Sequence, residues 1–247
     1  MAKDFFGEEV ASQYDDPNDA MSLPEAIDPV VDFLADLAGD GAALELGIGT
    51  GRIALPLAQR SVPVHGIDLS EAMVSRLRDK PGAEAIGVTI GDFATTTVEG
   101  SYSVAYLVFN TIMNVCSQDG QVSCFRNAAA HLEPGGCFVI EVMLPDLQRL
   151  PAGEIYRPFT VTPDHLGFDE YDVVEQGLIS HHYSISDGGL RINSVPFRYA
   201  WPAELDLMAQ LAGMTLRERY GDWDRSPFKA DSTKHVSVWE KAGPPVG

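Results

Sequence analysis

Apolar residues recur along the chain with two alternating periods, and that alternation predicts the fold. Between residues 26 and 38 the apolar side chains fall on one helical face, namely Ile27, Val30, Val31, Leu34 and Leu37. Short apolar runs then predict strands at 42–46, 63–67, 85–90, 104–109 and 138–143, and the stretches between them predict helices at 52–59, 71–80 and 118–132. Strands that alternate with helices indicate an α/β fold, a doubly wound Rossmann-like sheet.

The pattern changes after residue 145. Short alternating stretches at 155–161, 178–185 and 190–199 are separated by turn signals, and Asp187-Gly188-Gly189 predicts a hairpin. A helix at 204–211 and strands at 214–220 and 235–239 then return to the parallel sheet. We therefore expect an N-terminal arm at 1–25, a Rossmann-like core at 26–145 and 201–241, and an inserted antiparallel β lid at 146–200.

Composition restricts the partners of the chain. It has 36 acidic against 17 basic residues and a formal net charge of −19, which would repel nucleic acid and anionic membrane surfaces. No apolar run approaches the ~20 residues of a membrane span, and the N-terminus lacks the features of a secretory signal. The three cysteines form no CxxC pair and fit reduced thiols. We expect a cytoplasmic protein; its oligomeric state stays open, and a homodimer is compatible with the sequence.

A glycine-rich turn follows the first predicted strand. Gly47, Gly49 and Gly51 stand where a strand turns into a helix, so backbone N–H groups can approach a ligand closely. A dinucleotide fingerprint would need its third glycine at position 52, which is Arg52. The turn therefore fits either a ligand site or an ordinary glycine-rich turn between a strand and a helix, and Arg52 argues against a nucleotide-dependent oxidoreductase.

Acidic residues end the next two strands. Asp68 closes the second strand, where a carboxylate can accept hydrogen bonds from ribose hydroxyls. Asp92 closes the third, suited to an exocyclic amine, and Phe93 beside it can flank a ring. Together with the glycine turn, these residues line one edge of the predicted sheet with contacts that suit a nucleoside.

These motifs resemble, in order, those of class I S-adenosylmethionine-dependent methyltransferases of the small-molecule type. The similar segments are 45–51, 66–73, 91–93 and 132–136, within residues 40–145. The resemblance implies a seven-stranded sheet with an antiparallel last strand, S-adenosyl-L-methionine as cofactor and S-adenosyl-L-homocysteine as product. No set of His, Asp and Glu residues has the spacing of metal ligands, so we expect no metal site. The resemblance also implies a set of cofactor-binding residues: Glu45, Gly47 and Gly49 at the methionine part, Asp68 at the ribose, Met73, Asp92 and Phe93 at the adenine, and Gly51, Leu69 and Phe109 nearby. Tyr14 is similar to a tyrosine that closes over the cofactor in many members.

The acceptor side is less determined by the sequence. Residues 109–114 lack the Asn/Asp-Pro-Pro-aromatic signature of enzymes that methylate nucleobase amines or glutamine amides. Asn110 or Asn114 could present an amide oxygen to the acceptor, or each could cap the next turn. His181 and His182 are neighbours in one predicted strand and point to opposite faces, so at most one could be a general base in a pocket. The alternative for each histidine is a place on the surface or at an interface.

We expect a methyltransferase that moves a methyl group from S-adenosylmethionine to a nitrogen or oxygen atom of a small-molecule acceptor. The catalytic candidates are Tyr14, Asn110, His181 and His182. Acids outnumber bases in the insert, which favours a neutral or cationic acceptor. Two alternatives remain, a nucleotide-dependent oxidoreductase and a non-catalytic module that binds S-adenosylmethionine.

Overall fold

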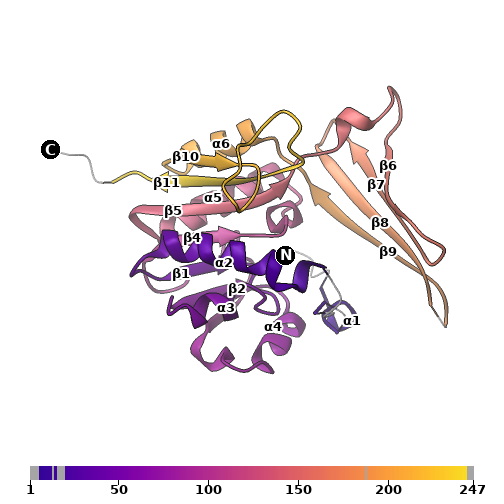
Figure 1. The fold of residues 1–247 in the computed structure, drawn as a ribbon. Helices are drawn as coiled ribbons and strands as arrows, with labels where there is room; N and C mark the ends of the chain where they lie inside the picture. The colour runs from indigo at the N-terminus through magenta and orange to yellow at the C-terminus, as the bar shows by residue number, and fades with distance from the viewer. Residues whose placement is uncertain (1–5, 13, 16–19, 187, 244–247) are drawn as a thin grey trace.

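The computed structural model describes residues 6–12, 14–15, 20–186 and 188–243. Two sheets organise it (Figure 1), a seven-stranded sheet in the order β10-β11-β5-β4-β1-β2-β3 and a four-stranded sheet in the order β6-β7-β8-β9. The larger sheet contains β1 (Ala43–Leu46), β2 (Val64–Asp68), β3 (Gly87–Ile90), β4 (Tyr102–Leu107), β5 (Leu132–Met143), β10 (Met214–Tyr220) and β11 (Lys234–Lys241). Strands β1 to β5 pair in parallel, and β11 is antiparallel to both β5 and β10. The predicted α/β class and the antiparallel last strand are confirmed.

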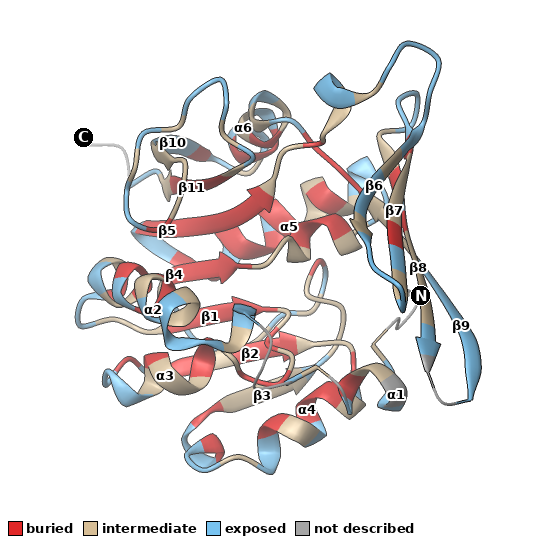
Figure 2. Ribbon diagram, turned by 45° about the vertical axis from the view of Figure 1, so that its right-hand side comes forward, coloured by how far each residue is buried: buried red, intermediate tan, exposed pale blue. Residues whose placement is uncertain are grey.

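Hydrophobic cores lie on both faces of the larger sheet, because successive residues of a strand point to opposite sides. Ala43 and Val104 face a core that includes α2 (Pro24–Ala38) and α3 (Ala54–Gln59). Leu44 and Ala105 face the other, which includes α5 (Gln118–His131) and α6 (Pro202–Leu211). The central strands are accordingly buried along most of their length (Figure 2).

Capping hydroxyls fix where two helices begin near the carboxyl ends of the strands. Ser70 Oγ accepts a hydrogen bond from Met73 N at 3.4 Å and starts α4 (Glu71–Arg78). Ser117 Oγ accepts one from Gly120 N at 3.1 Å and starts α5. The other helical elements of the described residues are short: α1 (Glu8–Ala11), η1 (Ala20–Ser22), η2 (Ala83–Ala85), η3 (Thr111–Asn114) and η4 (Leu147–Arg149).

The insert forms an antiparallel sheet with one more strand than the sequence predicts. Its strands are β6 (Tyr156–Val161), β7 (His165–Asp172), β8 (Gly177–Ser186) and β9 (Gly189–Arg198). The unpredicted strand β7 contains Gly167 and several acids, which are typical of loops. Gly167 is required by close packing, because a Cβ there would lie 2.3 Å from Phe159 Cε2. The predicted hairpin is present between β8 and β9, with Ser186 paired to Gly189, while Asp187 is outside the described residues.

The described part of the arm packs on the core. Glu8 of α1 forms an ion pair with Arg76 of α4 at 2.5 Å, and Ala11 is buried. Ser70 Oγ donates a hydrogen bond to Phe6 O at 2.7 Å. No helix of the described ranges is long and apolar enough to cross a membrane.

Candidate active site

A cavity of about 760 Å³ opens where the parallel strands end. Its wall combines the turns after β1, β2, β3 and β4 with the arm, the first turn of α5 and the end of β9. The carboxyl edge of a doubly wound sheet is the usual place for a ligand. The lining residues include Phe6, Tyr14, Gly47, Gly49, Asp68, Leu69, Met73, Asp92, Phe93, Phe109, Asn110, Asn114 and Phe197.

The glycine turn presents backbone to this cavity. Gly47 and Gly49 have φ values of 84° and 52°, a left-handed conformation that favours glycine. A Cβ at Gly47 would also lie 2.7 Å from Thr111 Cγ2. Gly51 belongs to the same turn but does not line the cavity; it is buried, and a Cβ there would lie 2.3 Å from Leu77 Cδ1. Gly51 therefore acts through packing between the turn and α4.

Asp68 orders the turn that follows β1. Its Oδ2 accepts a hydrogen bond from Gly49 N at 2.6 Å, and its Oδ1 accepts one from Ser70 N at 2.8 Å. Leu69 and Met73 continue the wall on the α4 side. The carboxylate thus faces the cavity while it holds the backbone of two neighbouring turns.

Asp92 and Phe93 form the next part of the wall. Asp92 Oδ1 accepts a hydrogen bond from Ala94 N at 2.9 Å, which closes a tight turn after β3. Asn127 Nδ2 donates to Phe93 O at 2.8 Å and fixes this turn against α5. The three strand ends singled out in the sequence therefore meet at one cavity.

Glu45 lies behind the glycine turn. It is 3% exposed and does not line the cavity. Burial raises the pKa of Glu45 to about 8, although the hydrogen bond that Tyr106 donates to its Oε2 at 3.0 Å acts in the opposite direction. Its carboxyl group is therefore protonated over part of the physiological pH range.

Arg52 joins the arm to the core, a role that the sequence did not reveal. Its guanidinium lies over the Tyr14 ring, and its Nη2 donates a hydrogen bond to Tyr14 O at 3.0 Å. Asp15 accepts a hydrogen bond from Thr50 Oγ1 at 2.7 Å and pairs with Lys80 at 2.7 Å. These contacts place Tyr14 in the cavity wall, where burial raises the pKa of its phenol and keeps it protonated.

The side chains of both asparagines after β4 form hydrogen bonds with backbone atoms. Asn110 Oδ1 accepts a hydrogen bond from Met143 N at 2.6 Å. Asn114 Nδ2 donates to Thr111 O at 3.2 Å, and its Oδ1 is buried without a partner among the described residues. Both side chains line the cavity. Asn110 precedes η3, but its side chain makes no capping hydrogen bond there, so the structure does not support the capping alternative for Asn110. Its amide oxygen binds the end of β5 instead.

The structure does not bring His181 or His182 to the cavity. They face opposite sides of the four-stranded sheet, as predicted, because they are successive residues of β8. His181 contacts Glu170 at 3.1 Å and Ser194 at 2.8 Å, while His182 stacks on His165. Among the described residues no histidine lines the cavity, and no cluster of three or more potential metal ligands occurs.

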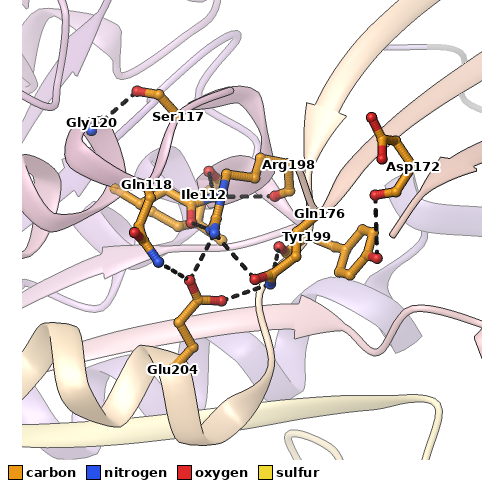
Figure 3. A network of polar contacts seen from close by, with 10 residues as sticks. Ile112, Ser117, Gln118, Gly120, Asp172, Gln176, Arg198, Tyr199 and Glu204 are labelled. Atoms are coloured by element: carbon orange, nitrogen blue, oxygen red, sulfur yellow. Dashed lines mark hydrogen bonds and ion pairs between the residues drawn. The ribbon is translucent and has the colours of Figure 1, made fainter. Parts of the chain in front are cut away.

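The inserted sheet reaches the cavity through the end of β9. Pro196 and Phe197 line the cavity, and Cys116 Sγ donates a hydrogen bond to Pro196 O at 3.3 Å. The next residue, Arg198, is buried in a polar network (Figure 3) and pairs with Glu204 of α6 at 2.7 Å.

Gln121 connects the same network to the core. It accepts a hydrogen bond from Arg198 Nη1 at 2.6 Å and donates to Ile112 O at 3.3 Å. The network therefore links the end of β9 to the turn that contains Ile112.

Comparisons with known proteins agree with this geometry. Residues 43–136 match the methyltransferase domain family. The solved structure of the CcbJ methyltransferase from Streptomyces caelestis is 40% identical, covers 97% of this chain and 98% of that chain, and superposes with a TM-score of 0.85. The chain belongs to the class I S-adenosylmethionine-dependent methyltransferases.

Two further relatives extend the comparison of this methyltransferase. The cypemycin N-terminal methyltransferase of Streptomyces sp is 27% identical over 206 residues, 80% of this chain and 82% of the relative. The S-adenosylmethionine-bound structure of CalS10, an amino pentose methyltransferase from Micromonospora echinaspora, shares the fold with a TM-score of 0.70 at 17% identity, over 98% of this chain and 100% of that chain. S-adenosylmethionine is the cofactor, and family membership sets aside the oxidoreductase alternative.

The cavity of this methyltransferase suits its cofactor. Its volume lies within the range of ~300–1,000 Å³ typical of ligand sites. The glycine turn offers a backbone surface that a side chain would block, and two carboxylates, Asp68 and Asp92, also line the wall. The cofactor supplies a methyl group on a positively charged sulfur, and the protein has to align the acceptor with it and exclude water.

Proposed function

We propose that this methyltransferase transfers the methyl group to the amine nitrogen of a small diffusible acceptor, which binds between the cofactor and the inserted sheet. The observation that carries the proposal is the chemistry of one part of the cavity wall, which we call the neutral wall. Beyond Phe109 and Asn110 the described lining residues are uncharged: Thr111, Asn114, Val115, Cys116, Ser117, Gly120, Ser123, Pro196 and Phe197. Burial raises the pKa of the Cys116 thiol, so this group also stays neutral.

A neutral wall suits an amine better than a hydroxyl acceptor. An alcohol or phenol must lose its proton to a base, and the described part of this wall offers neither histidine nor carboxylate. An amine only has to be unprotonated, and transfer from water into an uncharged cavity lowers the pKa of an ammonium group. Desolvation then supplies the nucleophile without a catalytic base.

The charge of the whole chain supports the same class of acceptor. A net charge of −19 attracts cations to the molecule, and an amine is a cation in neutral water. The names of two relatives also point to nitrogen: one is an N-terminal methyltransferase and the other an amino pentose methyltransferase. The acceptor can be attracted to the protein as a cation and still react as a neutral amine, because it loses its proton when it is buried in the cavity.

For the cofactor we propose the arrangement that the family resemblance implies, adjusted to the contacts found. Gly47 and Gly49 would bind the methionine part, Asp68 and Leu69 the ribose, and Met73, Asp92 and Phe93 the adenine, all of them on the cavity wall. Glu45 and Gly51 would act from behind the wall by shaping the glycine turn. Tyr14 would close over the methionine part and donate a hydrogen bond from its protonated phenol, with Phe109 on the opposite side.

A paired substrate screen tests the proposal. Small primary and secondary amines, each matched with the alcohol of the same skeleton, are incubated with enzyme and S-adenosylmethionine, and release of S-adenosylhomocysteine is measured. We expect turnover with a subset of the amines and none with their alcohol partners. Turnover of alcohols at rates equal to those of the paired amines would contradict the assignment of nitrogen as the methylated atom.

A further inference from the structure

Two successive residues of the cavity wall have a left-handed backbone. Phe109 and Asn110, directly after β4, have φ values of 53° and 64°. This conformation is unfavourable for a side chain as large as phenylalanine, so it persists only where surrounding contacts impose it. Both residues line the cavity. The contacts that impose this turn therefore influence the shape of the cavity.

Glu141, near the end of β5, makes the main contacts to the turn. Its Oε2 accepts a hydrogen bond from Phe109 N at 2.9 Å, and its backbone oxygen accepts one from Asn110 N at 3.3 Å. Asn110 Oδ1 in return accepts a hydrogen bond from Met143 N at 2.6 Å. The Glu141 side chain is 8% exposed and lies outside the cavity wall. It therefore touches the turn from behind.

Lys234, at the start of β11, holds the carboxylate of Glu141 in place. Its Nζ lies 3.0 Å from Glu141 Oε1 and 2.8 Å from Asp222 Oδ1. Burial lowers the pKa of Lys234, but the hydrogen bonds and charges of Asp222 and Glu141 outweigh burial and raise it overall. Lys234 is therefore a cation that neutralises the buried carboxylate.

We propose that Glu141, held by Lys234, is a positioning residue for methyl transfer, which acts by fixing Phe109 and Asn110 in the cavity wall. The chain of contacts runs from the loop between β10 and β11, through Lys234 and Glu141, to the turn after β4. Its effect does not depend on which atom of the acceptor is methylated. It belongs to the alignment of the reacting groups, which is the main contribution of a methyltransferase fold to the reaction.

Amide hydrogen exchange, resolved by residue with NMR and measured with saturating S-adenosylhomocysteine, tests the contact directly. In Glu141→Ala the amide of Phe109 should exchange at least about tenfold faster than in the wild type, because its hydrogen bond to a charged group is lost, whereas the amide of Asn110 keeps its backbone acceptor at residue 141. Amides of β1 should be unchanged. Equal exchange of the Phe109 amide in variant and wild type would overturn the proposal, and so would a uniform increase throughout the sheet.

Kinetics separate a positioning role from a purely structural one. The probe is the compound that the wild type methylates fastest in the paired amine and alcohol screen. Glu141→Ala should lower kcat by about tenfold to a hundredfold, while affinity for S-adenosylhomocysteine stays within about threefold. Glu141→Gln, which can still accept the hydrogen bond from Phe109, should recover part of the loss.

The kcat of Lys234→Met should lie between the values of Glu141→Ala and the wild type. The control Lys229→Met, at an exposed lysine of the same loop, should have the kcat of the wild type. A kcat that is unchanged in Glu141→Ala, or that falls only in proportion to lost folded protein, would overturn the proposal. A wild type that accepts alcohols as readily as amines would instead refute the proposed function, and the exchange measurement would still decide the role of Glu141.

Discussion

The guanidinium of Arg52 lies 4.8 Å from the centre of the Tyr14 ring and 5.3 Å from that of Phe109. One cation therefore joins the N-terminal arm to the turn after β4. The hydrogen bond from Arg52 Nη2 to Tyr14 O adds a polar link at 3.0 Å. Because Tyr14 and Phe109 both line the cavity, this arrangement connects arm closure with the shape of the site.

Replacement of Arg52 should loosen the arm and weaken cofactor binding. Arg52→Met keeps much of the side-chain length but removes the charge that interacts with both rings. The loss of a desolvated cation–π contact, ~0.5–2 kcal/mol, should weaken S-adenosylhomocysteine binding by about twofold to thirtyfold in calorimetry. Arg126→Met, at an exposed arginine of α5, is the matched control. An unchanged dissociation constant for Arg52→Met would show that the arm is held by other contacts.

Asp68 should be the most sensitive of the cavity carboxylates to substitution. It holds the amides of Gly49 and Ser70 and is proposed to bind the ribose, so Asp68→Ala removes several partners at once. We expect S-adenosylhomocysteine binding to weaken by about 1–3 kcal/mol, or about fivefold to more than a hundredfold. Asp68→Asn retains one acceptor oxygen, so its affinity for S-adenosylhomocysteine should be intermediate. Asp79→Ala, at an exposed site at the end of α4, should leave the affinity unchanged. Equal affinities for all four proteins would remove Asp68 from the site.

The buried carboxyl of Glu45 should make stability depend on pH. Its pKa is about 8 in the folded protein against 4.5 for an unperturbed glutamate, so the folded state binds the proton more tightly. Stability is then fully present below the unfolded pKa and falls as pH rises towards the folded pKa. Relative to the wild type, Glu45→Gln should gain a few kcal/mol of unfolding free energy between about pH 5 and pH 9, because glutamine cannot ionise.

Urea unfolding at each pH measures this difference. The exposed Glu133→Gln is the control and should follow the wild-type curve. A difference between Glu45→Gln and the wild type that is constant with pH would mean that Glu45 ionises as readily in the folded chain as in the unfolded one.

Arg198 and Glu204 should contribute strongly to the attachment of the inserted sheet. Their side chains are 6% and 16% exposed, so removal of one charge leaves the other buried without its partner. Arg198→Met should lower the unfolding free energy by about 3–5 kcal/mol, and Arg198→Met with Glu204→Leu should recover part of the loss. Arg217→Met breaks a pair whose side chains are both 43% exposed and should cost at most about 1 kcal/mol. Equal losses in the two single variants would contradict the role of the buried pair.

The sequence predicted the core more completely than the insert, for physical reasons. Parallel strands buried on both faces form continuous apolar runs, so β4 and β5 were recognisable. Strand β7 was missed because its glycine and acids resemble a loop, and only its packing against Phe159 explains Gly167. The four-stranded sheet is a tertiary arrangement that local propensity specifies weakly.

The sequence predicted the site residues that lie at strand ends. It missed the residues whose role depends on contacts between distant parts of the chain. Asp68 and Asp92 end successive strands, and the shared edge brings both to the cavity. The contact of Arg52 with Tyr14 joins residues far apart in the sequence, and that of Glu141 with Lys234 spans still more of the chain. No local pattern marks such pairs. His181 and His182 had suitable chemistry, but their strand lies away from the cavity wall, so their catalytic role has no geometric support here.

The position of the transferred methyl group tests the central claim most directly. S-adenosylmethionine labelled with ¹³C in its methyl group is incubated with the enzyme and the small amines and alcohols of matched skeleton, and the products are examined by NMR. The chemistry of the neutral wall predicts that the label appears on nitrogen, in a product formed only in the presence of active enzyme. A labelled methyl group on oxygen, with the amine of the same skeleton left unmethylated, would contradict the account.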